Sequence, residues 1–374
     1  MDSCDVLIIG GGPAGSTCAG RLRVRGLDVV VADKAGFPRD KVCAGWITTG
    51  VARELGLDPD SYGNGRVLQP ITGFRTAIGA GPDLHTDYGR VVSYGIRRCE
   101  FDQFLLERSG ARLRLEEPVK TLRREGAWWV MNDAVRAPML VGAGGHFCPV
   151  ARHLGARVGR GEPVVAAKEV EFPMTAAQQA ACRVDGEVPE LVFCDDLSGY
   201  GWCFRKGAYL NIGLGREDNH RLSEQLAEFC DLLKARGRIP ADIPSRFHGH
   251  AYLLYGHGPR QLLDDGVLLI GDAAGLAYPQ SGEGIRPAVE SGLMAAEVIA
   301  AARGQYSAAF LAPYEQRLRA RFGDGRGGIT DRIPARLKTF LASRLLTSPW
   351  FTRHVVLDRW FLHAGQAPLE GVPG

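Results

Sequence analysis

The sequence lacks the features that would place it among metal-binding, disulfide-rich or nucleic-acid-binding proteins. Nine cysteines are spread over 374 residues without a CxxC pair, which argues against a zinc site and against a disulfide framework. The formal net charge is only +3, so charge gives no reason to expect a nucleic-acid partner. His248 and His250 flank a glycine but have no third ligand nearby, so we expect no metal ion.

Long apolar runs are also missing. No run reaches the ~20 residues that a membrane-spanning helix needs, and no signal peptide is expected before the first strand, which we predict to begin at residue 5. No Gly-x-Ser-x-Gly elbow for acyl transfer is present. The scattered cysteines fit a reducing cytoplasm.

A GxGxxG sequence at residues 10–15 follows an apolar run, residues 5–9, that is typical of a buried strand. Its glycines let the backbone turn tightly and approach a pyrophosphate at the N-terminus of a helix, which we expect to reach about Arg25. A second apolar run ends at Asp33, near the place where an acidic side chain usually holds ribose hydroxyls. The βαβ context of a dinucleotide-binding motif is therefore present.

A second glycine-rich segment lies far along the chain, at residues 271–292. The run 267–270 predicts a buried strand that places Asp272 at the carboxyl edge of a sheet, where open α/β folds bind ligands. Gly282 and Gly284 then precede a helix predicted over residues 287–303, whose N–H groups and dipole suit the electron-rich pyrimidine end of a flavin. The two motifs together point to FAD.

On these motifs and on residues 37–45, 98–102, 200–202 and 213–215, the sequence resembles the p-hydroxybenzoate hydroxylase-type flavoproteins, and within them the geranylgeranyl reductase-related group. The resemblance implies an α/β fold in which a Rossmann-type FAD-binding domain is interleaved with a mostly antiparallel β-sheet substrate domain and followed by C-terminal helices. It also implies a set of residues that bind the cofactor: Gly10, Gly12, Pro13, Ala14, Gly15, Asp33, Lys34, Arg39, Ala44, Gly45, Arg98, Asp272, Gly282, Gly284 and Ile285.

Two departures from the family pattern bear on the cofactor. The group usually has Cys-Gly-Gly where this chain has residues 43–45 with Ala44 in the middle, which leaves the backbone less freedom near positive φ. The superfamily's Gly-Ala-Asp-Gly segment has Gly144 in place of the aspartate, a residue associated with nicotinamide cofactor and FAD binding. Because only one GxGxxG is present, we expect NAD(P)H or another electron donor to dock transiently.

The FAD-type segments are interrupted, so we predict a discontinuous organisation. Residues 1–50, 93–163 and 263–322 are expected to form the FAD-binding domain, and residues 51–92 and 164–262 the substrate domain. Residues 323–374 are expected to form a C-terminal helical segment, joined to the core by the glycine-rich run 323–328.

The substrate pocket and the acid are predicted from the same resemblance. Tyr200 and Trp202 match the family's pocket pattern and would lie with Phe204 on one face of a strand, although that pattern also fits ordinary core packing. Cys43 falls at the family's cysteine position, close to the flavin. It is either the acid of the reaction, with Arg39 and Lys41 able to lower its pKa, or a gate of the pocket, or an inert buried thiol.

From Arg336 to His363, apolar side chains recur at roughly helical spacing among basic ones, with a break at Pro349. The pattern predicts one or two amphipathic helices, which more often cap a core than lie on a membrane surface. Peripheral membrane contact is thus the less favoured interpretation.

The sequence therefore predicts a FAD-dependent oxidoreductase. The leading hypothesis is a geranylgeranyl reductase-type enzyme that reduces C=C bonds of an isoprenoid or similarly apolar small molecule. One alternative is a flavin-dependent monooxygenase, with hydroxylation favoured over halogenation because residues 201–206 do not match the Trp-x-Trp-x-Ile-Pro pattern usual in halogenases. The other alternative is a flavin-binding redox or interaction module without turnover.

Overall fold

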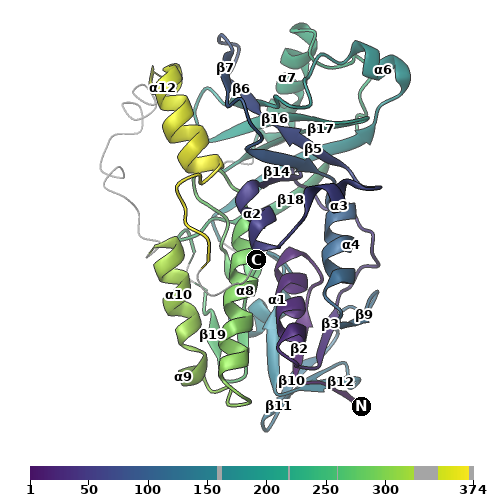
Figure 1. The fold of residues 1–374 in the computed structure, drawn as a ribbon, viewed down its shortest axis with the longest axis vertical. Helices are drawn as coiled ribbons and strands as arrows, with labels where there is room; N and C mark the ends of the chain where they lie inside the picture. Colours follow the sequence, from purple (N-terminus) through teal and green to yellow (C-terminus); the bar gives the residue numbers. More distant parts are fainter. Residues whose placement is uncertain (158–161, 218–219, 259, 324–343, 370–374) are drawn as a thin grey trace.

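A computed structural model describes residues 1–157, 162–217, 220–258, 260–323 and 344–369. The chain forms an elongated α/β molecule in which a parallel sheet with its helices lies at one end and a larger, mostly antiparallel sheet at the other (Figure 1). The predicted fold class is confirmed.

The first sheet has six strands in the order β19-β20-β13-β2-β3-β9 among the described residues, and all neighbours are parallel except β19 and β20. Its central strands consist of apolar residues that are buried throughout, as expected for a parallel sheet covered on both faces. The strand bounds are β2 (Val6–Ile9), β3 (Val29–Ala32), β9 (Arg112–Arg114), β13 (Met139–Gly142), β19 (Leu263–Asp264) and β20 (Val267–Leu269).

Helices α1 (Pro13–Val24), α4 (Arg98–Arg108) and α8 (Ile285–Ala301) pack beside this sheet, with α1 between the other two. A Cβ built on Gly292 would lie 2.6 Å from the carbonyl oxygen of Ala14, so α1 and α8 approach more closely than a larger residue would allow. α1 ends one residue before the predicted position, and Gly26 follows with φ of 84°. α8 begins two residues earlier than predicted, directly after Gly284.

The second sheet has seven described strands in the order β18-β14-β17-β16-β15-β6-β7, antiparallel except for the pair β15 and β6. Helix α7 (Leu222–Ala235) covers one face with the buried side chains of Leu226, Phe229 and Leu233. The strand bounds are β6 (Gly73–Ile78), β7 (Leu84–Asp87), β14 (Val164–Pro173), β15 (Glu190–Phe193), β16 (Gly199–Lys206), β17 (Tyr209–Arg216) and β18 (His248–Leu253).

Two smaller sheets were not predicted. One joins β1 (Asp2–Ser3), β12 (Val135–Ala137), β11 (Trp128–Met131) and β10 (Leu122–Glu125), and the other joins β4 (Trp46–Thr48), β8 (Ser93–Ile96) and β5 (Leu68–Ile71). The remaining described helices are short: α2 (Thr49–Glu54), α3 (Pro59–Gly63), α5 (Pro149–His153), α6 (Ala176–Ala181), η1 (Gly271–Ala274), α9 (Ala308–Leu311) and α10 (Pro313–Phe322).

Near the C-terminus, α12 (Pro349–Phe351) begins at the predicted break and continues into η3 (Thr352–Phe361), which has π-helical hydrogen bonding. Val356, Leu357 and Phe361 are buried in a cluster with aromatic residues of the second sheet, so this helix covers part of the core. The predicted linker beyond Gly323 and the start of the amphipathic pattern before Arg344 lie outside the described residues.

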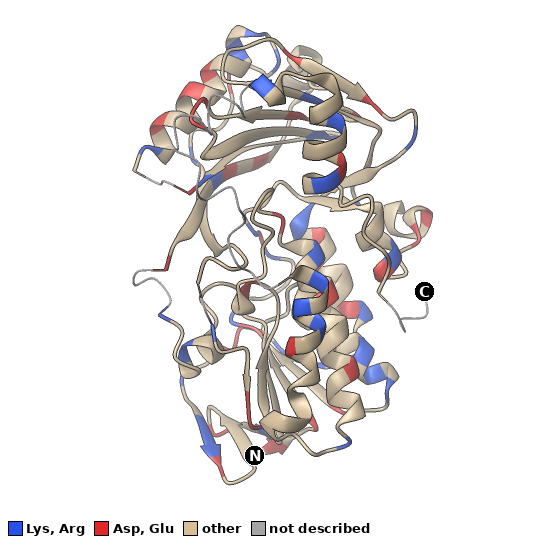
Figure 2. Ribbon diagram, turned by 90° about the vertical axis from the view of Figure 1, so that its left-hand side faces the viewer, with Lys and Arg blue, Asp and Glu red and all other residues tan. Residues whose placement is uncertain are grey.

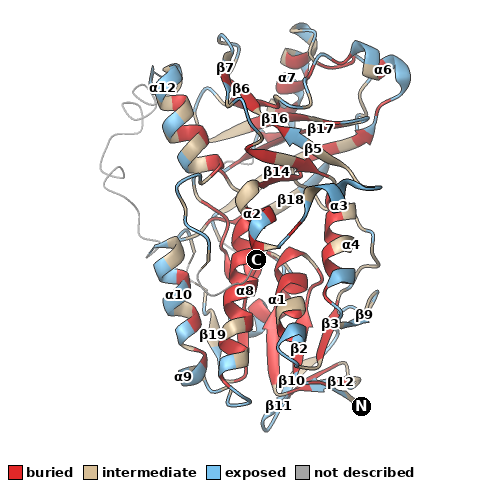
Figure 3. Cartoon of the chain, in the orientation of Figure 1, coloured by how far each residue is buried: buried red, intermediate tan, exposed pale blue. Residues whose placement is uncertain are grey.

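Burial is continuous through the central strands β2, β3, β13 and β20 and through most of α8 (Figure 3), whereas acidic and basic residues are interspersed on the helices of both ends (Figure 2). Within the described ranges, no helix is long and apolar enough to cross a membrane. All nine cysteines are free thiols.

Candidate FAD and substrate site

A cavity of about 730 Å³ opens where β2, β3, β13 and β20 end, and residues of both large sheets line it. Most of the side chains and glycines predicted to bind cofactor or substrate are among its lining residues. These are Gly10, Gly12, Pro13, Ala14, Asp33, Lys34, Arg39, Cys43, Ala44, Arg98, Tyr200, Trp202, Asp272, Gly282, Gly284 and Ile285.

Three predicted residues do not line the cavity, but two of them shape its surroundings. A Cβ on Gly15 would lie 1.9 Å from the carbonyl oxygen of Gly10, so only glycine allows α1 to pack here. Gly45 has φ of 62°, and a Cβ there would meet the carbonyl oxygen of Ile96 at 2.3 Å. Phe204 is buried against Trp46, with ring centroids 5.8 Å apart, and belongs to the core.

The N-terminal glycines form a cradle in front of α1. Gly10 has φ of 116°, and a Cβ there would lie 2.3 Å from the carbonyl oxygen of Ala143. At Gly12 a Cβ would meet only the Arg39 guanidinium, at 3.3 Å, so this position faces the cavity. No side chain caps the N-terminus of α1, which leaves its dipole and N–H groups directed at an anion.

Acidic and basic side chains surround the cradle. The Asp33 carboxylate accepts hydrogen bonds from the N–H groups of Gly11 at 2.8 Å and Ala35 at 2.9 Å. Arg98 binds the buried Asp102 carboxylate through two hydrogen bonds of 2.9 Å, and Arg39 reaches the same carboxylate at 3.3 Å. Asp102 therefore holds both guanidinium groups at the cavity.

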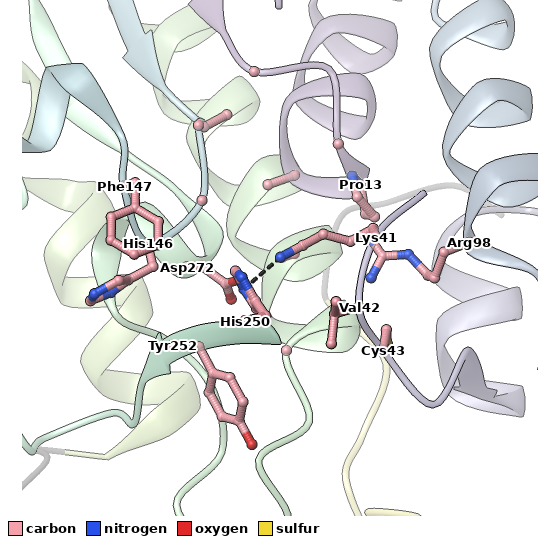
Figure 4. Close-up of a pocket in the computed structure, with 18 of the residues that line it drawn as sticks. Pro13, Lys41, Val42, Cys43, Arg98, His146, Phe147, His250, Tyr252 and Asp272 are labelled. Carbon is pink, nitrogen blue, oxygen red and sulfur yellow. Dashed lines mark hydrogen bonds and ion pairs between the residues drawn. The ribbon is translucent and has the colours of Figure 1, made fainter. Parts of the chain in front are cut away.

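Lys41, His250 and Asp272 meet in the middle of the cavity, where the Lys41 ammonium contacts His250 Nε2 (Figure 4). Burial lowers the pKa of Lys41 to about 8 and also lowers the pKa of His250. Burial would raise the pKa of Asp272, but His250, whose Nε2 lies 4.0 Å from the carboxylate, and the Lys41 charge outweigh it and hold the pKa below its usual value. The sequence analysis assigned His250 no role and Lys41 only a place beside Cys43.

The second glycine segment closes the same cavity. Gly282 has φ of 68°, and a Cβ there would lie 2.3 Å from the Tyr252 hydroxyl. A Cβ on Gly284 would approach the Asp272 carboxylate to 3.0 Å. The Glu283 carboxylate accepts a hydrogen bond from the Arg286 N–H in the first turn of α8. The N-cap residue Gly284 has no side chain and lines the cavity with Ile285, so a second helix N-terminus faces the cavity.

Aromatic rings form the wall on the side of the second sheet. Trp46, Tyr200, Trp202 and Tyr252 all line the cavity. The Tyr200 hydroxyl donates to the carbonyl oxygen of Ser281 at 2.6 Å, and its ring lies 6.1 Å from that of Trp202. The wall is apolar and continuous with the polar part of the cavity, so a ligand could extend from one into the other.

A buried hydrogen-bond network behind this wall was not predicted. Asn211 accepts a hydrogen bond from Trp202 Nε1 at 2.8 Å and donates to the Cys43 carbonyl oxygen at 3.1 Å and to Glu169 Oε2 at 2.9 Å. Burial raises the pKa of Glu169 to about 7. Asn211 thus ties the aromatic wall to the backbone of the Cys43 segment.

The expected neighbours of Cys43 are only partly present. Cys43 lines the cavity together with Arg98, whereas Arg39 pairs with Asp102 and Lys41 contacts His250. At the departure from the family pattern, a Cβ on Gly144 would lie 3.2 Å from Cys148 Cα and Sγ, so an aspartate there would need a small local shift. No group of acidic, histidine and cysteine side chains suited to a metal ion occurs in the part of the chain that the structure describes.

A glycine cradle at one helix start, acidic side chains beyond it and a second helix N-terminus facing the same cavity define a flavin-binding α/β protein. The family model described as "FAD binding domain" matches residues 3–324, and the chain belongs to that family. It is a FAD-dependent oxidoreductase, and the resemblance to the geranylgeranyl reductase-related group is confirmed.

Relatives and one solved structure span most of this chain. It is 28% identical over 334 residues to a digeranylgeranylglycerophospholipid reductase of Methanocaldococcus jannaschii, covering 84% of this chain and 82% of that one. It is 30% identical over 327 residues to a menaquinone reductase of Mycobacterium tuberculosis, covering 80% and 77%. The crystal structure of a geranylgeranyl bacteriochlorophyll reductase-like protein from Thermoplasma acidophilum has a TM-score of 0.75 at 21% identity, covering 100% and 94%.

The lining residues fit FAD. The cradle at Gly10 and Gly12, with Arg39 beside it, suits the pyrophosphate, and Asp33 suits the ribose hydroxyls. Asp272 lies where it can accept hydrogen bonds from the ribityl chain, and the start of α8 suits the pyrimidine end of the ring. The individual contacts of these residues with FAD stay predictions.

Proposed function

We propose that this oxidoreductase reduces carbon–carbon double bonds of an isoprenoid or similarly apolar substrate. The observation that carries the proposal is the aromatic wall of Trp46, Tyr200 and Trp202, which continues directly from the polar, FAD-type part of the cavity. Broad aromatic faces bind a prenyl chain through apolar contact without demanding polar groups from it. The relative from Methanocaldococcus jannaschii, a digeranylgeranylglycerophospholipid reductase, supports the same chemistry.

Bound FAD, once reduced, supplies a hydride. The protein's own part is to position the two ligands and to exclude water from the apolar side. Tyr200, fixed by its hydrogen bond to Ser281, and Trp202, fixed by Asn211, hold the wall rigid. Two proposals come from the sequence alone: Cys43 is the acid, and NAD(P)H or another electron donor docks transiently.

Anaerobic reduction of the purified protein tests the function. We expect a geranylgeranyl compound to reoxidise the flavin and to be recovered with fewer double bonds, while oxygen reoxidises the flavin slowly. Fast oxygen consumption with hydroxylation of an added substrate would instead identify a monooxygenase. A saturated analogue of the same prenyl compound is the matched control, because it can bind but cannot accept the hydride.

Peripheral contact with a membrane is a separate proposal. The inner face of η3 is buried, but Trp350 is 66% exposed and Leu345 46% exposed, close in sequence to the exposed Arg344. Apolar and basic groups exposed together suit an anionic lipid surface. Sedimentation with anionic and with neutral vesicles tests this, and equal absence of binding to both would contradict it.

A further inference from the structure

Two buried polar atoms without hydrogen-bond partners face each other beside the cavity. Glu283 Oε2 and His363 Nε2 are 3.8 Å apart, and their side chains are only 10% and 11% exposed. An unpaired buried polar atom costs ~1–3 kcal/mol, so one such pair in a folded protein calls for an explanation. If Glu283 Oε2 carries a proton, Oε2 and His363 Nε2 have to move closer by about 1 Å to form a normal hydrogen bond.

Both side chains are held in place by their own contacts. The other carboxylate oxygen of Glu283 accepts a hydrogen bond from the Arg286 N–H at 3.0 Å, and the Glu283 N–H donates to Ser281 Oγ at 3.3 Å. The His363 ring stacks on Tyr278 with centroids 3.9 Å apart, and its φ is 48°. The carbonyl oxygen of His363 accepts from Arg286 at 3.4 Å. Two segments 80 residues apart in sequence are thus locked against each other at this point.

Burial keeps His363 neutral near neutral pH and leaves Glu283 about half protonated there. Burial raises the pKa of Glu283 to about 7, and burial followed by the Arg286 charge lowers the pKa of His363 to about 4. Arg286 donates to the buried Glu290 carboxylate at 2.8 Å. Arg321 from α10 donates to the same carboxylate. One carboxylate balances only one of the two guanidinium charges, and the Arg286 charge favours the ionised form of Glu283.

Two phenols complete the groups that face the pair. Tyr278 lies under the imidazole and Tyr200 lies near the Glu283 carboxyl, and burial raises the pKa of both, so they stay protonated in the neutral range. Among the titratable groups facing this point, Glu283 is the one whose proton is exchangeable near pH 7.

The pair lies between the cavity and the surface. Glu283 lines the cavity, whereas His363 does not and is followed by the exposed residues Ala364 and Gly365. In comparison, Cys43 lines the cavity together with Arg98, whose guanidinium does not give up a proton in proteins. Glu283 has a neighbour that can pass on a proton, and that neighbour is near solvent.

We propose that Glu283 and His363 form the route by which the proton consumed in the reaction enters the cavity, with Glu283 as the acid and His363 as its positioning and reloading partner. The inference rests on the proposed function: one alkene carbon gains a hydride from the reduced flavin as the C=C π bond breaks. The other carbon takes the proton of the Glu283 carboxyl. The carboxylate left behind is protonated again from solvent through His363.

The first test needs no FAD and no substrate. In FAD-free protein labelled with ¹³C at the glutamate carboxyl carbons, comparison with Glu283→Gln assigns the Glu283 signal, which is then followed by NMR from pH 4 to 9. We expect a midpoint near 7 and a shift of that midpoint in His363→Asn, where asparagine tolerates the left-handed backbone. A midpoint near 4.5 overturns the proposal, as does a midpoint that His363→Asn leaves unchanged.

The second test is the anaerobic reoxidation of reduced enzyme by a prenyl compound. Glu283→Gln should slow it by on the order of 100-fold and remove its decline above pH 7, with a smaller loss in His363→Asn. The surface variants Glu315→Gln and His354→Asn are matched controls, since Glu315 and His354 each pair only with an exposed or half-buried neighbour of the same helix. Wild-type rates and pH dependence in Glu283→Gln overturn the proposal.

The two tests separate this proposal from the proposed function. If no prenyl compound reoxidises wild-type enzyme, the proposed function fails, while the carboxyl titration still decides whether Glu283 and His363 hold an exchangeable proton. Should Glu283→Gln fail to fold or to bind FAD, Glu283→Asp keeps the acid and shortens its reach by one methylene. That variant should keep the pH decline at a lower rate, and a rate without pH dependence contradicts the route.

Discussion

Replacing Asn211 by aspartate should loosen the link between the aromatic wall and the Cys43 segment without changing side-chain size. Aspartate keeps the oxygen that accepts from Trp202 but removes the donor that binds the Cys43 carbonyl and Glu169. Each buried acceptor left without a donor costs ~1–3 kcal/mol, so the two together predict a loss of ~2–6 kcal/mol in the free energy of unfolding.

The loss should also grow with pH. Burial already raises the pKa of Glu169 to about 7, so its stabilising contribution is present at low pH and falls as the pH rises from 4.5 through 7. A second carboxyl group at position 211 would sit beside Glu169 and Glu171, and above pH 7 the like charges repel. At pH 5 one carboxyl can stay protonated and donate to the other, which restores part of the lost bonding.

Thermal melting of Asn211→Asp and wild type at pH 5, 7 and 8 measures both effects, with FAD content determined by absorbance. Asn64→Asp, at an exposed position, controls for the general effect of the added charge. Melting temperatures of Asn211→Asp equal to those of wild type at all three pH values would show that the network has no energetic importance.

Three further predictions concern the cavity itself. Gly12→Val should give folded protein without FAD, because its side chain fits beside Arg39 only by taking the place of the pyrophosphate, and a yellow variant with one FAD per chain contradicts this. Trp202→Ala should lower substrate affinity or turnover and leave the FAD content near normal, while the free energy of unfolding falls by ~3–5 kcal/mol. A variant that does not fold at the assay temperature would show that Trp202 acts mainly in core packing. Cys43→Ser and Cys43→Ala should oxidise FADH2 at similar rates if Glu283 is the acid, whereas a graded loss from serine to alanine, with FAD retained, would assign the proton to Cys43.

The parts of the fold that follow from local backbone requirements could be predicted from the sequence. Gly10 has a φ and a close approach to Ala143 that only glycine permits, so the motif marks its own geometry. The buried strands around it are short apolar runs, and Gly26 ends α1 in the left-handed region. The start of α8 was placed two residues late because Gly284 precedes it without a capping side chain that would mark the boundary.

The side chains that the sequence did not reveal meet through tertiary structure. Lys41 contacts His250 across 209 residues, and Asn211 reaches Cys43 across 168, so neither spacing leaves a local pattern. Strand alternation correctly put Phe204 on the face of Trp202, but it cannot tell how far along a strand a cavity extends. For that reason Phe204 was assigned to the pocket and lies beyond it, in the core.

The C-terminal segment belongs to the site although none of its described residues lines the cavity. Phe361 stacks on Trp46 with centroids 5.6 Å apart and meets the Tyr200 ring edge-on at 5.3 Å, so it supports the aromatic wall from behind. Two residues further along the chain, the carbonyl oxygen of His363 accepts a hydrogen bond from Arg286 at the start of α8. Contacts at both places fix the same segment, and any displacement of it would disturb the substrate wall and the Glu283 carboxyl together. The amphipathic pattern that suggested a cap over the core therefore marks a structural element that couples the apolar and the polar ends of one cavity.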